Sequence, residues 1–293
     1  MDQFDNKTAF LSGGAGGIGR ALAGTFLDAG MNVVLADLDR DRLDDSLVAL
    51  DAPGRVRAID LDLTCRDSWS RAADEAERQF GRIHILCNNA GIGGVDPPLG
   101  DMPPEDFDLL VAVNLTGVFN GIRTVVNRIR AHGEGGHVVN TASMAGIVPS
   151  PLSGAYSATK FAVIGLSETL REQLAPEGIG VSVLCPGKVD TGIGARWRTD
   201  RPSARGSAQP PRPVSPNRGM APGSVARRVM QAIRQNEFYI ITHPEFRPVV
   251  EILHAELLEA FGESAEAGYR DDISYLGGPV LARAARSTPR GRP

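Results

Sequence analysis

The chain has 293 residues, enough for one large domain or two small ones with a proper hydrophobic core. Its net charge of -4 and pI near 5.8 argue against a nucleic-acid-binding surface, because a phosphate-binding face normally makes a domain basic. Three widely spaced cysteines (Cys65, Cys87 and Cys185) without zinc-ligand spacing indicate buried thiols in a reducing compartment and no metal site. The N-terminus shows no secretory leader and no segment approaches ~18 uninterrupted apolar residues, so we expect a soluble, cytoplasmic protein without a membrane partner.

The first predicted unit is a strand over residues 8–12, a glycine-rich loop and a helix. Gly13, Gly17 and Gly19 would let the backbone approach a pyrophosphate, whose charge is stabilised by the free N–H groups at the start of the helix. Their GxxxGxG spacing differs from the GxGxxG pattern of the larger dinucleotide-binding folds. A flexible turn without a ligand is the alternative, although the flanking strand and helix are the context that the binding motif requires.

The second predicted strand, residues 31–37, ends on Asp37. A carboxylate at this position can bind both ribose hydroxyls of NAD and would repel the 2′-phosphate of NADP. Leu38 supplies no compensating positive charge, so the sequence predicts a preference for NAD. The alternative is that Asp37 only caps the next helix, residues 39–50, because aspartate is a preferred N-cap residue.

Strands and helices continue to alternate, with strands over residues 55–62 and 83–88 and a helix between them. Short apolar strands of this kind predict an α/β fold, a doubly wound Rossmann fold with a parallel sheet of about seven strands and helices on both faces. Asp62 would end the third strand and the segment Asn88 to Gly91 the fourth, at the edge where such sheets bind ligands. Asn88 could instead serve only as a turn residue.

A long helix is predicted over residues 104–133, with Pro104 in its first turn and Gly133 near its end. Asn114 interrupts the apolar stripe of this helix. A buried amide needs hydrogen-bond partners, so Asn114 indicates a specific hydrogen-bonding role. A satisfied core asparagine without such a role stays an open alternative.

Ser143, Tyr156 and Lys160 are the candidate catalytic residues. Tyr156 and Lys160 are four residues apart in a predicted helix, which places both side chains on one face. The ammonium would stabilise the phenolate and lower the pKa of Tyr156 toward the range of a general acid/base. Ser143 follows the strand over residues 137–142 and could donate a hydrogen bond to a substrate oxygen. A tyrosine and a lysine at this spacing also occur by chance, so the pair alone is a weak signal.

The rest of the chain contains a strand over residues 178–185, a segment rich in proline and arginine over residues 199–219, and two helices flanking a strand at 237–242. We expect one domain, residues 1–262, with a mobile substrate loop over about 192–221. Residues 263–293 should form an extended or disordered tail that ends in a basic run: Arg283, Arg286, Arg290 and Arg292.

With these motifs in place, the chain resembles the short-chain dehydrogenase/reductase family over roughly residues 6–262. The resemblance rests on SGGAGGIG, Asp37, NNAG, Asn114, Ser143, YSATK and PGKVDT, which occur in the family's order and spacing. It implies that Tyr156 is the general acid/base, Ser143 orients the substrate oxygen, Lys160 binds the nicotinamide ribose and lowers the tyrosine pKa, and Asn114 holds a water of a proton relay. The cofactor-binding set that it implies is Ser12, Gly13, Gly17, Ile18, Gly19, Asp37, Leu38, Asp62, Leu63, Asn89, Ala90, Gly91, Tyr156, Lys160, Pro186, Gly187, Val189 and Thr191.

These residues predict an oxidoreductase that transfers a hydride between NAD and a secondary alcohol or ketone. The chain's longer loop and C-terminal part resemble those of family members that act on aryl or polycyclic alcohols, including hydroxysteroids, so we expect a bulky hydrophobic substrate. The expected substrate contacts are Gly93, Met144, Leu152 and Trp197, with the segment from residue 192 onward closing as a lid. The alternatives are a 3-oxoacyl reductase whose anionic substrate is clamped by the loop arginines, and an NAD-binding sensor without catalysis.

The family resemblance also implies an oligomer. Small residues on the predicted Tyr156 helix (Ala158, Ala162, Gly165 and Thr169) would permit close approach of another helix, either within the domain or in a second subunit. We therefore expect a homodimer or homotetramer whose other partner is a small-molecule alcohol or ketone.

Overall fold

The computed structural model describes residues 3–204, 218–262, 266 and 268–273. The chain divides into two compact units, Met1–Glu245 and Phe246–Pro293, and the first unit holds all the strands of the sheet. This boundary lies before the predicted domain end at residue 262, because the last helix belongs to the second unit. The predicted basic run at the C-terminus and residues 205–217 of the proline-rich segment lie outside the described residues.

The first unit is built on a parallel sheet of seven strands in the order β3-β2-β1-β4-β5-β6-β7. The strands are short apolar runs with mostly buried residues, as expected for a sheet that is covered on both faces. The strand order reverses between β1 and β4, and ligands of α/β proteins bind at such a point of reversal. The strand bounds are β1 Thr8–Ser12, β2 Asn32–Asp37, β3 Val56–Asp60, β4 Ile85–Asn88, β5 Gly136–Thr141, β6 Ile179–Cys185 and β7 Tyr239–Ile241.

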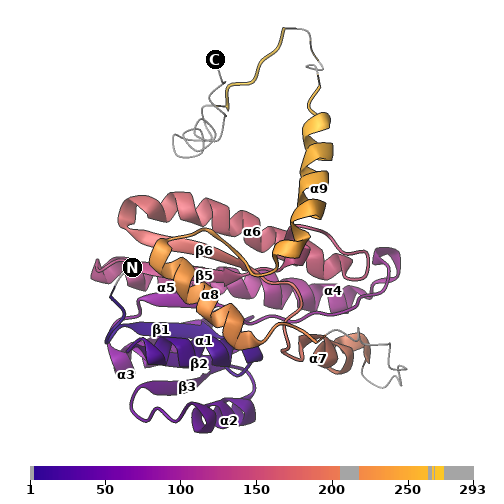
Figure 1. Ribbon diagram of the computed structural model, residues 1–293. Helices are drawn as coiled ribbons and strands as arrows, with labels where there is room; N and C mark the ends of the chain where they lie inside the picture. The colour runs from indigo at the N-terminus through magenta and orange to yellow at the C-terminus, as the bar shows by residue number, and fades with distance from the viewer. Residues whose placement is uncertain (1–2, 205–217, 263–265, 267, 274–293) are drawn as a thin grey trace. The chain divides into compact units, whose positions relative to one another are not determined.

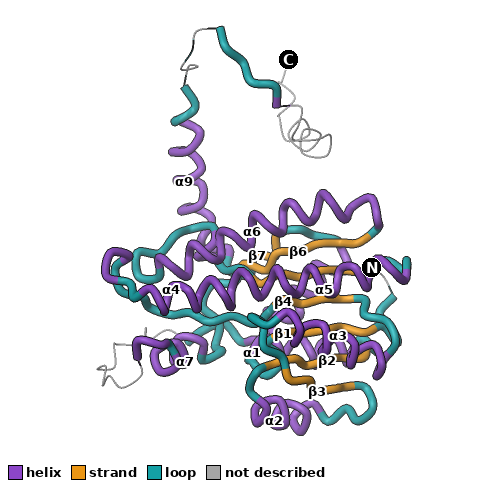
Figure 2. Tube along the Cα trace, turned by 180° about the vertical axis from the view of Figure 1, so that it is seen from behind, coloured by secondary structure: helices purple, strands orange, loops and turns teal. Residues whose placement is uncertain are grey.

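Helices cover both faces of this sheet. α1 and α8 pack against each other on the near face in Figure 1, and α3, α5 and α6 cover the opposite face, which Figure 2 shows from behind. This arrangement confirms the predicted doubly wound α/β fold. The helix bounds are α1 Gly17–Asp28, α2 Arg40–Leu50, α3 Arg66–Phe80, α4 Pro104–Val111, α5 Gly117–His132, α6 Gly154–Leu174, α7 Ile193–Asp200, α8 Pro222–Gln235 and, in the second unit, α9 Arg247–Glu259.

The third strand is shorter than predicted. β3 ends at Asp60, and Asp62 lies in the turn that follows. The Asp62 carboxylate accepts hydrogen bonds from the backbone N–H of Thr64 at 2.9 Å and from its hydroxyl at 2.7 Å. Such a side-chain turn competes with strand pairing and takes the chain out of the sheet.

The long helix predicted over residues 104–133 is continuous, but its middle is not α-helical. A turn of π-helix, Ala112–Thr116, joins α4 to α5 and contains Asn114. By length and composition alone the stretch Pro104–His132 is apolar enough to cross a membrane. It packs instead as a core helix, as its buried apolar side chains show: Leu110, Val118, Val125, Val126 and Ile129.

Residues 193–204, the first part of the segment predicted as a mobile loop, are helical. Ile193–Asp200 forms α7, and Pro202–Ala204 forms a short 3-10 turn. Gly192 precedes α7 with a φ of +73°, in the left-handed region that favours glycine. Beyond the segment that the structure leaves undescribed, Met220 forms a parallel bridge with Val189.

Candidate active site

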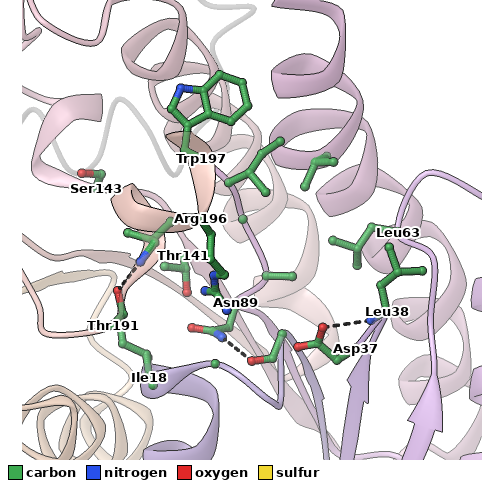
Figure 3. Close-up of a pocket in the computed structure, with 18 of the residues that line it drawn as sticks. Ile18, Asp37, Leu38, Leu63, Asn89, Thr141, Ser143, Thr191, Arg196 and Trp197 are labelled. Carbon is green, nitrogen blue, oxygen red and sulfur yellow. Dashed lines mark hydrogen bonds between the residues drawn. The ribbon is translucent and has the colours of Figure 1, made fainter. Parts of the chain in front are cut away.

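A cavity of about 660 Å³ opens at the carboxyl ends of the strands. Figure 3 shows Asp37 and Leu38 at one end of it and Ser143 and Trp197 at the other, with Arg196 extending between the two ends. This volume lies within the usual range for ligand and cofactor sites, and its position is the one at which parallel α/β sheets bind ligands.

The glycine loop forms the floor of the cavity between β1 and α1. Gly13 has a φ of +68°, and a Cβ added there would lie 2.7 Å from the Cα of Ala90. A Cβ added at Gly19 would lie 2.1 Å from the carbonyl oxygen of Gly13. The loop therefore packs directly on the end of β4, and Gly17 brings the first turn of α1 to the cavity wall. A phosphate here would meet the free N–H groups of that turn.

Among the described residues, two predicted cofactor residues support the glycine loop but do not line the cavity: Ser12 and Gly19. The Ser12 hydroxyl accepts hydrogen bonds from the backbone N–H groups of Asn89 at 3.2 Å and Ala90 at 3.3 Å. All the other predicted cofactor residues line the cavity: Gly13, Gly17, Ile18, Asp37, Leu38, Asp62, Leu63, Asn89, Ala90, Gly91, Tyr156, Lys160, Pro186, Gly187, Val189 and Thr191.

The Asp37 carboxylate is held in place at the end of β2 by backbone donors. It accepts hydrogen bonds from the N–H of Ala15 at 3.2 Å and of Leu38 at 2.9 Å. The N-cap of α2 is Asp39, whose carboxylate accepts from the N–H of Arg42. The interpretation of Asp37 as the cap of this helix is therefore wrong, and its carboxylate faces the cavity.

Two arginines that sequence reasoning missed lie in this region: Arg42 and Arg196. Arg42 donates a hydrogen bond to the carbonyl oxygen of Ala15 at 2.8 Å, beneath the glycine loop. Burial and the positive charge of Arg42 lower the pKa of Arg196, and the negative charge of Asp37 partly offsets this. The sequence prediction treated residues 192–221 as a loop, so it contained no helix whose spacing could have placed Arg196 on the same side as the cavity.

Tyr156 and Lys160 lie on one face of α6, as their spacing predicts. The Lys160 Nζ is 5.5 Å from the centre of the Tyr156 ring and donates a hydrogen bond to the carbonyl oxygen of Thr141 at 2.9 Å. Lys160 is only 2% exposed, and burial lowers its pKa to about 8. Both side chains line the cavity.

The expected lowering of the Tyr156 pKa by Lys160 is not present in this structure. Burial raises the pKa of Tyr156 to about 12, and a hydrogen bond with the Ser143 side chain offsets only part of this. The physical reason is that an apolar environment disfavours the phenolate more than the hydroxyl partner favours it. Ser143 also caps the short 3-10 turn after β5, where it accepts from the N–H of Ala145 at 3.1 Å.

Asn114 is fully buried beneath the cavity and does not line it, among the residues that the structure describes. Its amide accepts from the N–H of Ile92 at 2.9 Å and donates to the carbonyl of Ile92 at 2.8 Å and to the hydroxyl of Thr159 at 3.2 Å. A Cβ added at Gly91 would lie 3.2 Å from Asn114 Oδ1 and 3.4 Å from Lys160 Nζ. Asn114 therefore joins the π-turn to the segment after β4, next to the lysine.

Asn88 is also buried, and it links two strands of the sheet rather than serving only as a turn residue. It is 1% exposed, and its amide donates to Asn140 Oδ1 at 2.9 Å, which links β4 to β5.

The turn after β6 brings four predicted residues to the cavity wall: Pro186, Gly187, Val189 and Thr191. His243, which sequence reasoning missed, supports this turn. Its Nδ1 accepts a hydrogen bond from the N–H of Gly187 at 3.0 Å, and a Cβ added at Gly187 would lie 2.8 Å from the imidazole ring. Only a glycine allows the turn to approach the histidine this closely.

Of the predicted substrate contacts, the structure places only Trp197 at the cavity wall, within the described residues. Met144 is buried behind the site, Leu152 is 61% exposed, and Gly93 packs against the Tyr156 ring. These three residues do not line the cavity, because proximity in sequence to Ser143 and Tyr156 does not fix which residues reach it. The apolar wall comes instead from residues that only the fold brings together: Ile92, Leu109, Val113, Ile193 and Trp197.

Known proteins match both the sequence and the fold. The short chain dehydrogenase family matches residues 7–202. A C alpha-dehydrogenase from a Sphingobium species is 33% identical over 287 residues, which cover 94% of each chain. A 3beta-hydroxysteroid dehydrogenase 2 from Eggerthella lenta is 36% identical over 204 residues, which cover 69% of this chain and 78% of that protein.

Among solved structures, a short chain dehydrogenase/reductase from Burkholderia phymatum in complex with NAD matches with a TM-score of 0.81 and 33% identity, covering 92% of this chain and 100% of that chain. The family match, the sequence relatives and this structure agree with the predicted resemblance and with a nicotinamide dinucleotide as the cofactor. The chain therefore belongs to the short-chain dehydrogenase/reductase family of oxidoreductases.

Proposed function

We propose that the protein is an NAD-dependent alcohol dehydrogenase or ketone reductase. The observation that carries this proposal is that Ser143, Tyr156 and Lys160 line the same cavity as the glycine loop and Asp37. A sensor protein needs only the cofactor half of this set, so the presence of both halves favours catalysis. The carboxylate of Asp37 supports NAD over NADP, because it would repel a 2′-phosphate.

In the proposed reaction the phenolate form of Tyr156 accepts the hydroxyl proton of the alcohol, and in the reverse direction the phenol form gives a proton to the ketone oxygen. The nicotinamide ring supplies the hydride acceptor when the cofactor is bound. Ser143 donates a hydrogen bond to the substrate oxygen and so holds it next to the phenol. The Lys160 Nζ lies 5.5 Å from the centre of the Tyr156 ring, and we propose that its charge offsets part of the desolvation that raises the tyrosine pKa.

A bulky hydrophobic secondary alcohol is the proposed substrate class. The wall beside Tyr156 is apolar, and a pocket of this kind binds ligands mainly by excluding water from apolar surface. The name of one relative, a 3beta-hydroxysteroid dehydrogenase, is in keeping with this class. An anionic acyl substrate stays the alternative. The two described arginines of the 199–219 segment, Arg201 and Arg218, pair with Asp106 and Asp190 and do not line the cavity, whereas Arg196 of α7 does line it.

The proposal includes a cytoplasmic homodimer or homotetramer. The small-residue stripe on α6 supports an oligomer, because Ala158, Gly165 and Thr169 are exposed and Phe161 beside them is 44% exposed. In the described part of the chain nothing lies within 4 Å of a Cβ added at Gly165. The stripe is thus available to a second subunit. Light scattering tests this, and a monomer near 31 kDa would contradict it.

An activity screen tests the proposed function. The purified protein is given NAD and a panel of aryl, steroid, terpenoid and 3-hydroxyacyl alcohols, and NADH absorbance is followed. Tyr156→Phe is expected to bind NADH as wild type does while turnover falls by about 10² to 10⁴. Wild-type turnover in this variant would refute the assignment of Tyr156, and exclusive use of a 3-hydroxyacyl thioester would refute the hydrophobic-alcohol class.

A further inference from the structure

Asp96 is a buried carboxylate that touches both the tyrosine helix and the substrate wall. It lies after β4 and is 4% exposed. Its Oδ1 accepts a hydrogen bond from Trp197 Nε1 at 3.1 Å, and its Oδ2 accepts one from the backbone N–H of Tyr156 at 3.3 Å. Two residues that face the same cavity from different helices, α6 and α7, are therefore joined through one side chain.

At the Tyr156 end, Asp96 caps a helix to which it does not belong. α6 begins at Gly154, and its N-cap residue Ser153 makes no side-chain capping bond in the described structure. The Asp96 carboxylate takes that place and puts a negative charge at the positive end of the helix dipole. Burial raises the pKa of Asp96, and the hydrogen bonds from Tyr156 and Trp197 partly offset this. An apolar residue would avoid that cost, so the carboxylate indicates a positioning role.

The two glycines before Asp96 contact the same pair of rings. Gly93 has a φ of +152°, and a Cβ added there would lie 2.2 Å from Cδ2 of Tyr156. A Cβ added at Gly94 would lie 2.9 Å from Cδ1 of Trp197. The backbone of residues 93–96 therefore runs against the phenol ring on one side and the indole on the other, with no room for a side chain between them.

The turn that follows α7 is held by a second buried carboxylate. The carboxylate of Asp106, which is fully buried, accepts hydrogen bonds from the N–H and the hydroxyl of Ser203 at 2.9 Å and 2.5 Å and lies 3.9 Å from the Arg201 guanidinium. Trp197 itself packs in an apolar cluster with Leu110 and Ala155. Asp106 anchors the turn that follows α7. Within the described part of the chain, Asp96 accepts hydrogen bonds from both Trp197 Nε1 and the Tyr156 N–H and so links the cavity-facing tryptophan to the tyrosine backbone.

We propose that Asp96, with Gly93 and Gly94, is a positioning residue that sets the spacing between the Tyr156 phenol and the Trp197 indole and so selects the alcohol by size. The inference rests on the proposed function. Because Asp96 takes the indole N–H, Trp197 presents an apolar ring to the cavity and no donor. This arrangement suits an aromatic or alicyclic group on the carbinol carbon.

Asp96→Asn is the test variant. The amide is nearly the same size, but it has one acceptor oxygen and a donor group, so it cannot offer a separate oxygen to the indole and to the Tyr156 N–H as the carboxylate does. Asp101→Asn is the matched control, because it removes an exposed carboxylate from the same inter-element segment. Gly94→Ala is a second variant that displaces Trp197 without touching the carboxylate, in case Asp96→Asn does not fold.

The contact itself is measured by fluorine NMR on protein labelled with 5-fluorotryptophan. The chain has two tryptophans, Trp69 and Trp197, so two resonances are expected, and Trp197→Phe assigns them. Trp69 stacks on Phe10 in the core and reports whether the fold is intact. Asp96→Asn should move the Trp197 resonance and leave that of Trp69 in place, whereas Asp101→Asn should move neither. An unmoved Trp197 resonance in Asp96→Asn would overturn the inference.

The functional consequence is measured with NAD and two probe alcohols, 1-phenylethanol and 2-propanol. Loss of one hydrogen bond to a charged group predicts a fall of about tenfold or more in kcat/KM for 1-phenylethanol and a smaller fall for 2-propanol, which does not reach the tryptophan. The NADH dissociation constant should stay within about twofold of wild type. A merely structural role would lower both kcat/KM values in proportion, and that result overturns the inference. A wild-type protein that oxidises neither alcohol instead counts against the proposed function, while the fluorine resonances still decide the contact.

Discussion

Replacing Lys160 by methionine should change the pH dependence of stability in a direction that the structure defines. Burial lowers the pKa of Lys160 from 10.5 to about 8, and each pKa unit corresponds to about 1.4 kcal/mol. The charged lysine therefore costs the folded state about 3 kcal/mol below pH 8. Between pH 8 and 10.5 the unfolded chain holds more protons than the folded one, so wild-type stability rises with pH through this window as the cost is relieved.

Lys160→Met removes this pH-dependent contribution, and it also removes the hydrogen bond to the Thr141 carbonyl, which is worth about 1 kcal/mol at any pH. We expect the variant to be more stable than wild type by about 2 kcal/mol at pH 7. That advantage should shrink by about 2 kcal/mol or more by pH 10. Lys188→Met, at an exposed lysine, is the matched control for the loss of one positive charge.

Urea unfolding followed by circular dichroism at pH 7, 8, 9 and 10 measures these differences. Protein concentration must be the same in every sample and the cofactor must be absent, because association and ligand binding both stabilise the folded state. A difference between Lys160→Met and wild type that does not change with pH would refute the reasoning. It would mean that the buried ammonium is solvated or paired well enough to keep its ordinary pKa.

The other predictions concern the cofactor half of the site. Asp37→Ser should narrow the preference for NAD over NADP by about tenfold or more, mainly in the cofactor KM, because it removes the charge that faces a 2′-phosphate; a wild-type enzyme that already uses both cofactors equally would contradict this. Arg196→Gln should raise the NADH dissociation constant, measured by fluorescence titration, by about tenfold, because the guanidinium of Arg196 lies in the cavity. Arg198→Gln, on the exposed side of α7, is the control and should leave this constant unchanged. Equal constants for the two variants would show that Arg196 does not reach the cofactor. Gly19→Ala should destabilise the fold by about 2 kcal/mol or more, because its Cβ would lie 2.1 Å from the Gly13 carbonyl; an unchanged Tm would show that α1 can move away from the loop.

Much of the fold could be predicted because local physics and tertiary structure agree in this chain. Strands of a parallel sheet are covered on both faces, so they appear as short apolar runs, and glycine, proline and polar caps mark where they end. The glycine loop was predictable for the same reason: Gly13 and Gly19 stand where a side chain has no room, and the motif lies between a strand and a helix. The error at the end of β3 arose from Asp62, whose turn with Thr64 competes with the strand.

The sequence alone was enough to place Tyr156 and Lys160 on one face of a helix, but it was not enough to predict their pKa values. Spacing alone suggested that the ammonium lowers the tyrosine pKa. In the structure both groups are buried, and desolvation raises the pKa of Tyr156 to about 12 and lowers that of Lys160 to about 8. Burial depends on what packs over a residue, and no local pattern carries that information.

The sequence by itself determined which elements form and which residue types stand at the strand ends, because hydrophobic periodicity and glycine positions act over a few residues. Only the tertiary structure decided which distant side chains meet there. Asp96, Arg196 and His243 come from segments without a recognisable motif, and each reaches the site through the packing of another element. Met144 and Leu152 show the converse, since they are close in sequence to the catalytic set and yet do not line the cavity. Side-chain direction in loops is set by long-range contacts, and these exist only once the sheet and its helices have assembled.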